Sequence, residues 1–290
     1  MWQFLVKRWI QDFATKQVYK AASEQAQQFT AEEASSSEED QRLPVDVGVV
    51  MSHASEAGGL VDRLTESATL RADNFTVHLG TIHEKRIVIA VADEKIESAE
   101  QATRAIIDAH QPSWIIAAGF ATGLSENLTA EDIILADRVI DSAGHQLQLN
   151  LHVDEASLRS TPGTHVGPVL SSMSQERAKA LAGSALCADL HSFSVAESCR
   201  SLKRPCLVVR VVTRTDADQP PPELRHLQNQ SSVAGKLGAA TGAVWRRPAW
   251  LKDMWHDKEL ALRGSERLAR FLSGMFAQLP ANSRRDAAES

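Results

Sequence analysis

Charged side chains follow two apolar runs of this sequence, at positions where a buried strand would end. Glu56 comes shortly after the first run, and the last run, Leu207–Val212, is followed by Arg214, Asp216 and Asp218. Carboxylates can act as general acids or bases, and an arginine can hold an anionic group. Because the carboxyl ends of parallel strands meet at one edge of a sheet, we expect these side chains to share a site.

The stretch Trp114–Asp141 combines a buried strand with a glycine-containing segment. Its first five residues, WIIAA, form an apolar run that predicts a strand buried on both faces. The next five, GFATG, predict a small-residue loop whose backbone N–H groups face a ligand at the strand's carboxyl end. A second apolar strand is predicted at 133–136.

The stretch Ala188–Asp218 adds a second pattern. It reads ADLHSFSVAESCRSLKRPCLVVRVVTRTDAD and predicts a helix over 189–202 that feeds a β-branched strand over 207–212. Together, the two stretches resemble the nucleoside phosphorylase and nucleosidase superfamily over roughly residues 45–220. The matching features are the strand followed by GFATGL, the triplet Asp189-Leu190-His191 that opens a helix, and the final motif, which Arg210 enters from the strand over 207–212. The segment GAVWRRPAWLKDM further resembles hopanoid-associated phosphorylases.

This resemblance implies cleavage of the N-glycosidic bond of a nucleoside through an oxocarbenium-like transition state. Glu56 would activate water as the base, and Asp216 or Asp218 would be the acid. The residues implied in substrate binding are Phe120, Ala121, Thr122, Gly123, Asp189, His191 and Arg214. No cofactor and no metal ligand are implied. We expect a nucleoside as the small-molecule partner, and a homodimer.

Several positions depart from the family pattern. His191 stands where the family has a ribose-binding glutamate, and a histidine is not a fixed anion. Arg214 stands at the family's acid, and an arginine does not deliver a proton at neutral pH. Asp93-Glu94-Lys95 replaces a glycine-rich turn, which disfavours close approach of the backbone to phosphate.

Three functions are therefore compatible with the sequence. The first is hydrolysis of a purine nucleoside similar to methylthioadenosine or adenosylhomocysteine, and the sequence favours this enzymatic function. The second is a catalytically impaired descendant that binds a nucleoside or an anion. The third is a membrane-associated phosphorylase-like enzyme of hopanoid-type lipid metabolism.

Periodicity predicts the elements that position the site. Strands alternate with helices, which favours an α/β fold: a three-layer domain over 45–280 with a mixed, mainly parallel sheet flanked by helices. Further strands are predicted at 45–51, 75–79, 86–92 and 166–171, and further helices at 98–110, 175–182 and 252–278. The strands at 75–79 and 86–92 are expected to pair as a hairpin.

The termini differ from this domain. Residues 1–30 contain an amphipathic helix whose apolar stripe consists of Trp2, Leu5, Val6, Trp9, Ile10 and Phe13. This helix is expected to dock on the domain or a second subunit, to contact a membrane surface, or to remain a loose appendage. Residues 31–44 are acidic and Ser-rich and predict a flexible linker, and residues 281–290 predict a disordered tail.

Composition limits the function classes. The net charge of −6 shows no basic footprint for nucleic acid. The three cysteines, at 187, 199 and 206, match neither a zinc pattern nor a disulfide framework, which indicates a reducing cytoplasm. No apolar run is long enough to span a bilayer, so membrane association would be peripheral, through residues 2–20.

Overall fold

The computed structural model describes residues 45–93, 95–149, 161–172, 182–215 and 250–279, with the backbone alone described for 250–257. The predicted helix at 1–30, the linker at 31–44, the tail at 281–290 and most of the predicted helix at 175–182 lie outside the described residues. Asp216 and Asp218 lie outside them as well. No described helix is long and apolar enough to cross a bilayer.

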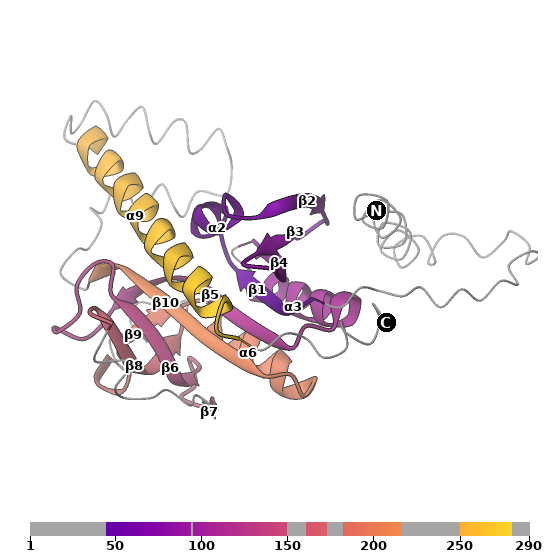
Figure 1. Cartoon of the computed structure of the whole chain (residues 1–290). Coiled ribbons are helices and arrows are strands. Elements are labelled where there is room, and N and C mark those ends of the chain that lie inside the picture. The colour runs from indigo at the N-terminus through magenta and orange to yellow at the C-terminus, as the bar shows by residue number, and fades with distance from the viewer. Residues whose placement is uncertain (1–44, 94, 150–160, 173–181, 216–249, 280–290) are drawn as a thin grey trace, which may run out of the picture.

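The described chain is built on one mixed sheet of ten strands (Figure 1). Along the sheet, the order is β10-β6-β8-β9-β5-β1-β4-β3-β2, with β7 paired to β6. Because β10 also pairs with β5, the strands β5, β10, β6, β8 and β9 close into a ring. The strands are β1 (Val47–Met51), β2 (Thr65–Arg71), β3 (Phe75–Ile82), β4 (Lys85–Ala92), β5 (Trp114–Gly123), β6 (Ile133–Ile140), β7 (Gln146–Gln148), β8 (Thr164–Ser171), β9 (Cys187–Asp189) and β10 (Cys206–Thr215).

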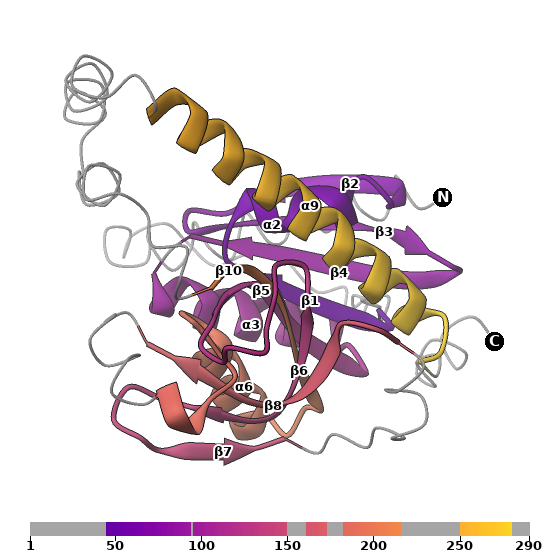
Figure 2. The same cartoon turned by 90° about the vertical axis from the view of Figure 1, so that its left-hand side faces the viewer.

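Helices cover both faces of this sheet, as the predicted α/β fold requires. One face is covered by α2 (Ala54–Val61) and α9 (Trp250–Phe276), and α9 lies diagonally across it (Figure 2). The other face is covered by α3 (Ile96–His110) and α6 (Ser192–Ser201). A short 3-10 helix, η1 (Ala182–Ser184), precedes β9.

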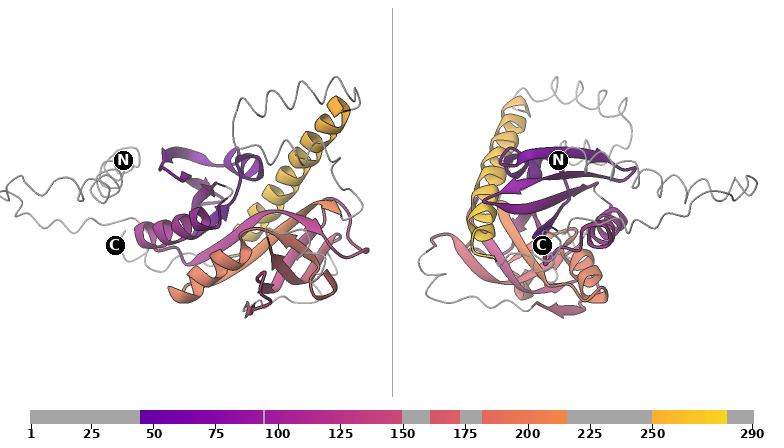
Figure 3. Two further views of the ribbon diagram at one scale, coloured as in Figure 1. Left: turned by 180° about the vertical axis from the view of Figure 1, so that it is seen from behind. Right: turned by 45° about the vertical axis from the view of Figure 1, so that its right-hand side comes forward.

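The central strands are apolar at nearly every position because both of their faces are covered. β1 lies between β4 and β5, parallel to both, and all five of its residues are buried. β5 and β10 run side by side in parallel (Figure 3). Since β1, β5 and β10 are parallel, their carboxyl ends lie at one edge, where a site is expected.

Two sequence predictions were wrong in detail. The segment 119–123 is not a loop, because β5 continues to Gly123 through its pairing with β9 and β10. The helix predicted from Asp189 begins at Ser192, and residues 187–189 form β9. The antiparallel pairing of β3 with β4 confirms the predicted hairpin. The edge strand β2 was not predicted, because its mostly exposed side chains lack an apolar pattern.

Candidate active site

A buried ion pair joins β9 to β10. Nη2 of Arg210 lies 2.6 Å from Oδ2 of Asp189, and both side chains are only 2% exposed. Nε of Arg210 also donates to Oγ of Ser192, the first residue of α6, at 2.9 Å. Loss of either partner would leave a buried charge uncompensated. Through the contact with Ser192, Arg210 also holds the start of α6 against β10.

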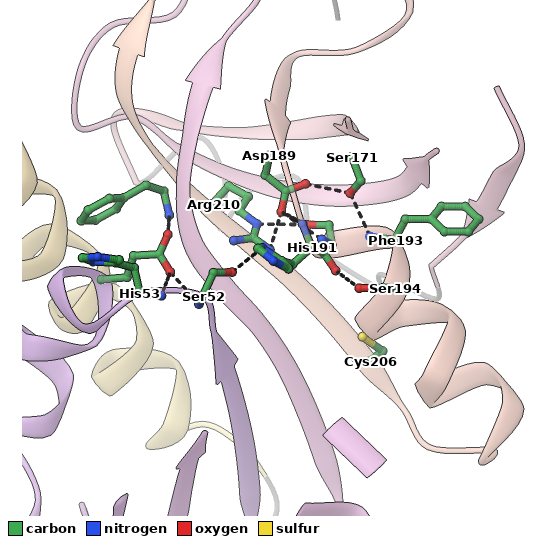
Figure 4. Close-up of polar contacts among 12 residues, drawn as sticks. Ser52, His53, Ser171, Asp189, His191, Phe193, Ser194, Cys206 and Arg210 are labelled. Atoms are coloured by element: carbon green, nitrogen blue, oxygen red, sulfur yellow. Dashed lines mark hydrogen bonds and ion pairs between the residues drawn. The ribbon is translucent and has the colours of Figure 1, made fainter. Parts of the chain in front are cut away.

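The carboxylate of Asp189 is held by further protein groups (Figure 4). Its Oδ2 accepts from the backbone N–H groups of His191 and Ser192 and from the Ser192 hydroxyl. Its Oδ1 accepts from Oγ of Ser171, which itself accepts from the backbone N–H of Phe193. Asp189 was predicted to bind substrate, but its oxygens are engaged in organising the first turn of α6.

Glu56 lies in the first turn of α2, just after β1. Its Oε2 accepts from the backbone N–H groups of Ser52 at 2.8 Å and His53 at 3.2 Å. Its Oε1 accepts from the backbone N–H of Phe120 on β5 at 2.9 Å. A carboxylate offers about four lone-pair directions. Described residues use three of them, which leaves one direction on Oε1 for a water or ligand proton.

Gly119 allows the carboxylate of Glu56 to approach the guanidinium of Arg210. A Cβ on this residue would lie 2.5 Å from Nη1 of Arg210 and 2.8 Å from each carboxylate oxygen of Glu56. No side chain fits in that space. The absence of a side chain at Gly119 therefore brings a buried carboxylate and a buried guanidinium against the same point of β5.

His191 connects this cluster to the end of β1. Its Nδ1 lies 2.7 Å from Oγ of Ser52, and the histidine is 2% exposed while the serine is partly exposed. The serine hydroxyl can donate and accept, and the tautomer of His191 decides which role it takes. The pair, labelled in Figure 4, thus places a hydroxyl at the carboxyl end of β1, on a residue whose backbone N–H donates to Glu56.

Asp93 extends the polar environment to the end of β4. Burial by itself would raise its pKa, but hydrogen bonds from the Ser98 side chain and the Lys95 backbone, with the charges of Lys95 and His191, lower the pKa below its ordinary value. Asp93 is therefore an anion at neutral pH. It adds a negative charge near the Ser52–His191 pair.

The predicted binding residues on β5 divide between the two faces of the strand. Phe120 reaches the cluster through its backbone N–H, while its ring packs on the α9 face, near Gly264. Ala121 is buried in the core on the opposite face, and Thr122 is exposed. Gly123 is buried and pairs with β9 and β10.

Arg214 lies on β10, four residues beyond Arg210. After a register shift it pairs with Thr122, which is two residues beyond Phe120 on β5, and it is partly buried. Its backbone therefore lies at the same strand edge as the cluster. The predicted acids Asp216 and Asp218 follow β10 outside the described residues.

Several residues of the cluster were not predicted as functional from the sequence. These are Ser52, Asp93, Ser171, Ser192 and Arg210. One signal was present, because Arg210 is a charged residue inside a β-branched run, and a buried charge requires a partner. Within the described ranges, no three His, Cys, Asp or Glu side chains converge as metal ligands would.

Comparisons with known proteins identify the fold. The sequence model of the family described as Phosphorylase superfamily matches residues 46–182. A search of curated protein sequences found no match to the chain.

Solved structures of nucleosidases share this architecture. The 5'-methylthioadenosine/S-adenosylhomocysteine nucleosidase of S. pneumoniae, solved with a transition-state inhibitor, has a TM-score of 0.60 at 15% identity, covering 81% of this chain and 100% of that one. The corresponding Helicobacter pylori enzyme has a TM-score of 0.60 at 17% identity, with coverage of 81% and 100%. A futalosine hydrolase mutant of Helicobacter pylori has a TM-score of 0.60 at 16% identity, again with coverage of 81% and 100%.

Proposed function

Because this chain is a divergent member of the nucleoside phosphorylase superfamily, we propose that it hydrolyses the N-glycosidic bond of a nucleoside. The observation that carries this proposal is the placement of Glu56 at the carboxyl end of β1. Its Oε1 keeps one lone-pair direction beside the contact with Phe120 N–H. From there, the carboxylate can take a proton from a water that attacks the sugar carbon.

The sugar is assigned to the Ser52–His191 pair. Ser52 Oγ and the imidazole offer both hydrogen-bond donors and acceptors, which suits the hydroxyl groups of a ribose. The nucleosidases with a similar fold act on methylthioadenosine and adenosylhomocysteine according to their names. A purine nucleoside of that kind is therefore the first substrate class to test.

Hydrolysis fits this site better than phosphorolysis. The backbone N–H groups of Ser52 and His53, at the end of β1, already donate to the carboxylate of Glu56. They are thereby occupied, and a phosphate placed there would face the negative charge of the glutamate. Water carries no charge and meets no such repulsion.

Departure of the base requires protonation or electrostatic stabilisation. We assign the acid to Asp216 or Asp218, which follow β10 in the sequence. Arg214 can donate hydrogen bonds to a leaving base, but an arginine does not deliver a proton at neutral pH.

A second candidate function is nucleoside or anion binding without turnover. The three backbone contacts of Glu56 also suit a purely structural role, since the contact with His53 completes a capping box at the start of α2 and the contact with Phe120 ties α2 to β5. Arg214 at the position of the family's acid favours the same alternative, because an arginine suits a carboxylate or phosphate ligand.

A rate assay separates these candidates. A panel of purine nucleosides is incubated with the full chain, with and without phosphate, and release of the free base is measured. We expect release that does not require phosphate, and a loss of about a hundred- to ten-thousand-fold in Glu56→Gln. The side-chain amide that this substitution introduces would face at least one backbone donor, so the melting temperature and nucleoside binding of the variant are measured alongside. Binding without base release from any nucleoside would favour the second candidate.

A further inference from the structure

Two of the three cysteines of the chain meet where α6 ends and β10 begins. Cys199 lies in the last turn of α6, and Cys206 is the first residue of β10 (Figure 4). The thiol of Cys199 and the thiol of Cys206 are hydrogen-bond partners, and both cysteines are free. The proposed reaction uses neither of them, so the pair is a candidate for separate chemistry.

The backbone between the two cysteines holds them together. The backbone N–H of Arg204 donates to the carbonyl oxygen of Cys199 at 2.8 Å. The backbone N–H of Lys203 donates to the carbonyl oxygen of Arg200 at 3.1 Å, and Lys203 has a left-handed φ of 53°. These two bonds and this φ form a Schellman motif, which reverses the chain at the end of a helix. The chain thus returns along α6, and Cys206 packs against the apolar cluster that contains Cys199.

The two thiols differ in their access to solvent. Cys199 is fully buried, whereas Cys206 is partly exposed. The hydrogen bond with Cys206 and burial raise the pKa of the Cys199 thiol, so Cys199 is protonated at neutral pH. Because the thiolate is the nucleophile in exchange with a disulfide, Cys199 does not react first with a dissolved reagent. Cys206 is the thiol that such a reagent reaches.

We propose that Cys199 and Cys206 form a reversible modification site, which closes to an intramolecular disulfide by exchange with a small-molecule disulfide. The thiolate of Cys206 attacks one sulfur of the small disulfide, whose S–S bond breaks, and one small thiol leaves. Cys199 then loses its proton and attacks Sγ of Cys206, and the second small thiol leaves. The protein is oxidised by two electrons and the small disulfide is reduced to two thiols. This exchange is independent of the nucleosidase activity.

The disulfide would anchor α6 at both ends. The first residue of the helix, Ser192, already contacts Arg210 of β10 at 2.9 Å. A bond between Cys199 and Cys206 ties the last turn of α6 to the first residue of the same strand. A cross-link restricts the opened states of the segment that it closes. We therefore expect amide exchange in residues 199–204 to slow by at least about tenfold on oxidation, with no change in α3.

Peptide mapping of the full chain tests the exchange. The native protein is incubated with oxidised glutathione and then unfolded in iodoacetamide, which alkylates every remaining thiol. Trypsin cleaves after Arg200 and Lys203, so a disulfide between Cys199 and Cys206 holds two peptides together. We expect this linked pair, and its loss after treatment with dithiothreitol. Cys187 is the matched internal control, because it is fully buried in the same cluster and should be found alkylated.

Substitution of each cysteine separates the two steps. Cys199→Ala should keep glutathione on Cys206, with at least about tenfold more adduct than wild type, because the second thiol is missing. Cys206→Ser should leave Cys199 as a thiol that is alkylated only after unfolding. A wild-type chain whose Cys206 stays a thiol or retains glutathione would overturn the proposal. So would a Cys199–Cys206 disulfide that forms only in urea, or a Cys206 disulfide between two chains.

Discussion

At the residue scale, the site depends on the missing side chain of Gly119. Nη1 of Arg210 and the carboxylate of Glu56 both lie within 2.8 Å of the place where a Cβ would stand. The guanidinium cannot easily move away, because Asp189 and Ser192 hold it. A methyl group would therefore displace the carboxylate from the backbone donors it accepts from.

Gly119→Ala should lower the free energy of unfolding by about 1–3 kcal/mol, the usual cost of overpacking a buried site. It should also reduce any nucleosidase activity. The matched control is Gly58→Ala, because its Cβ meets no atom within 4 Å and alanine favours a helix interior by about 0.5–1 kcal/mol. Urea denaturation of both variants measures the difference, and equal stability of the two would contradict the close approach.

Asp93 makes the stability of the fold depend on pH. Hydrogen bonds from Ser98 and the Lys95 backbone, with the nearby charges, outweigh burial and lower its pKa in the folded state. A carboxyl group with a depressed pKa stabilises the fold above its unfolded pKa of about 3.9, and that stabilisation is lost as the pH falls through the folded pKa. Asp93→Asn should thus be less stable than wild type at pH 7.

As the pH falls below the unfolded pKa of about 3.9 and toward the lower folded pKa, the two proteins should converge in stability, because Asp93 becomes protonated first in the unfolded and then in the folded state. Urea midpoints measured from pH 7 to pH 3 test this. A difference that stays constant over the whole range would show that charge on Asp93 is not the cause.

At the element scale, α9 lies at the end of the described chain and contacts α2, the helix that carries Glu56. Leu268, Leu272 and Phe276 recur every four residues, are fully buried, and pack on the α9 face of the sheet. Ser265 of the same helix donates to the backbone carbonyl of Glu56 and accepts from the backbone N–H of Gly59. Packing of α9 therefore also positions α2 and its glutamate.

Leu268→Ala should lower the free energy of unfolding by about 2–5 kcal/mol, because it leaves a cavity in the core. Leu262→Ala is the matched control on the same helix and should change stability by less than about 0.5 kcal/mol, since Leu262 is 72% exposed. Thermal or chemical denaturation compares the two. Similar losses in both variants would mean that α9 does not pack as described.

At the scale of the whole molecule, one sheet separates two apolar clusters. The cluster under α3 and α6 contains Cys187 and Cys199, and the cluster under α2 and α9 contains Leu268. Burial raises the pKa of the Cys187 thiol, and contact with Cys206, together with burial, raises that of Cys199. Both thiols should therefore react with alkylating agents only when the fold opens.

Because the central strands contribute to both clusters, we expect the two clusters to unfold together. Leu268→Ala should then speed alkylation of Cys199 by about thirtyfold or more, in proportion to its loss of about 2 kcal/mol or more in stability. Mass spectrometry of chain labelled by iodoacetamide under native conditions measures this, with Leu262→Ala as the control. Unchanged labelling in Leu268→Ala would show that the two clusters open independently.

The sequence by itself determined the fold class and most of the elements. Runs such as Val47–Met51 and Arg86–Ala92 are apolar at nearly every position, and burial on both faces of a central strand requires that pattern. It also placed Glu56 just after the first strand. These features depend on local periodicity, which can be recognised in the sequence without knowledge of distant contacts.

Only the tertiary structure decided which polar residues meet. The sequence separates Glu56, Gly119 and Arg210 by many residues, and their proximity depends on the pairing of β10 with β5. The same pairing turned the predicted loop at 119–123 into strand. Asp189 was predicted to bind substrate, and in the structure its Oδ2 contacts Arg210 and the first turn of α6 while its Oδ1 accepts from Ser171. Such engagement follows from contacts between distant segments, because a buried charge must find a partner that local sequence does not specify.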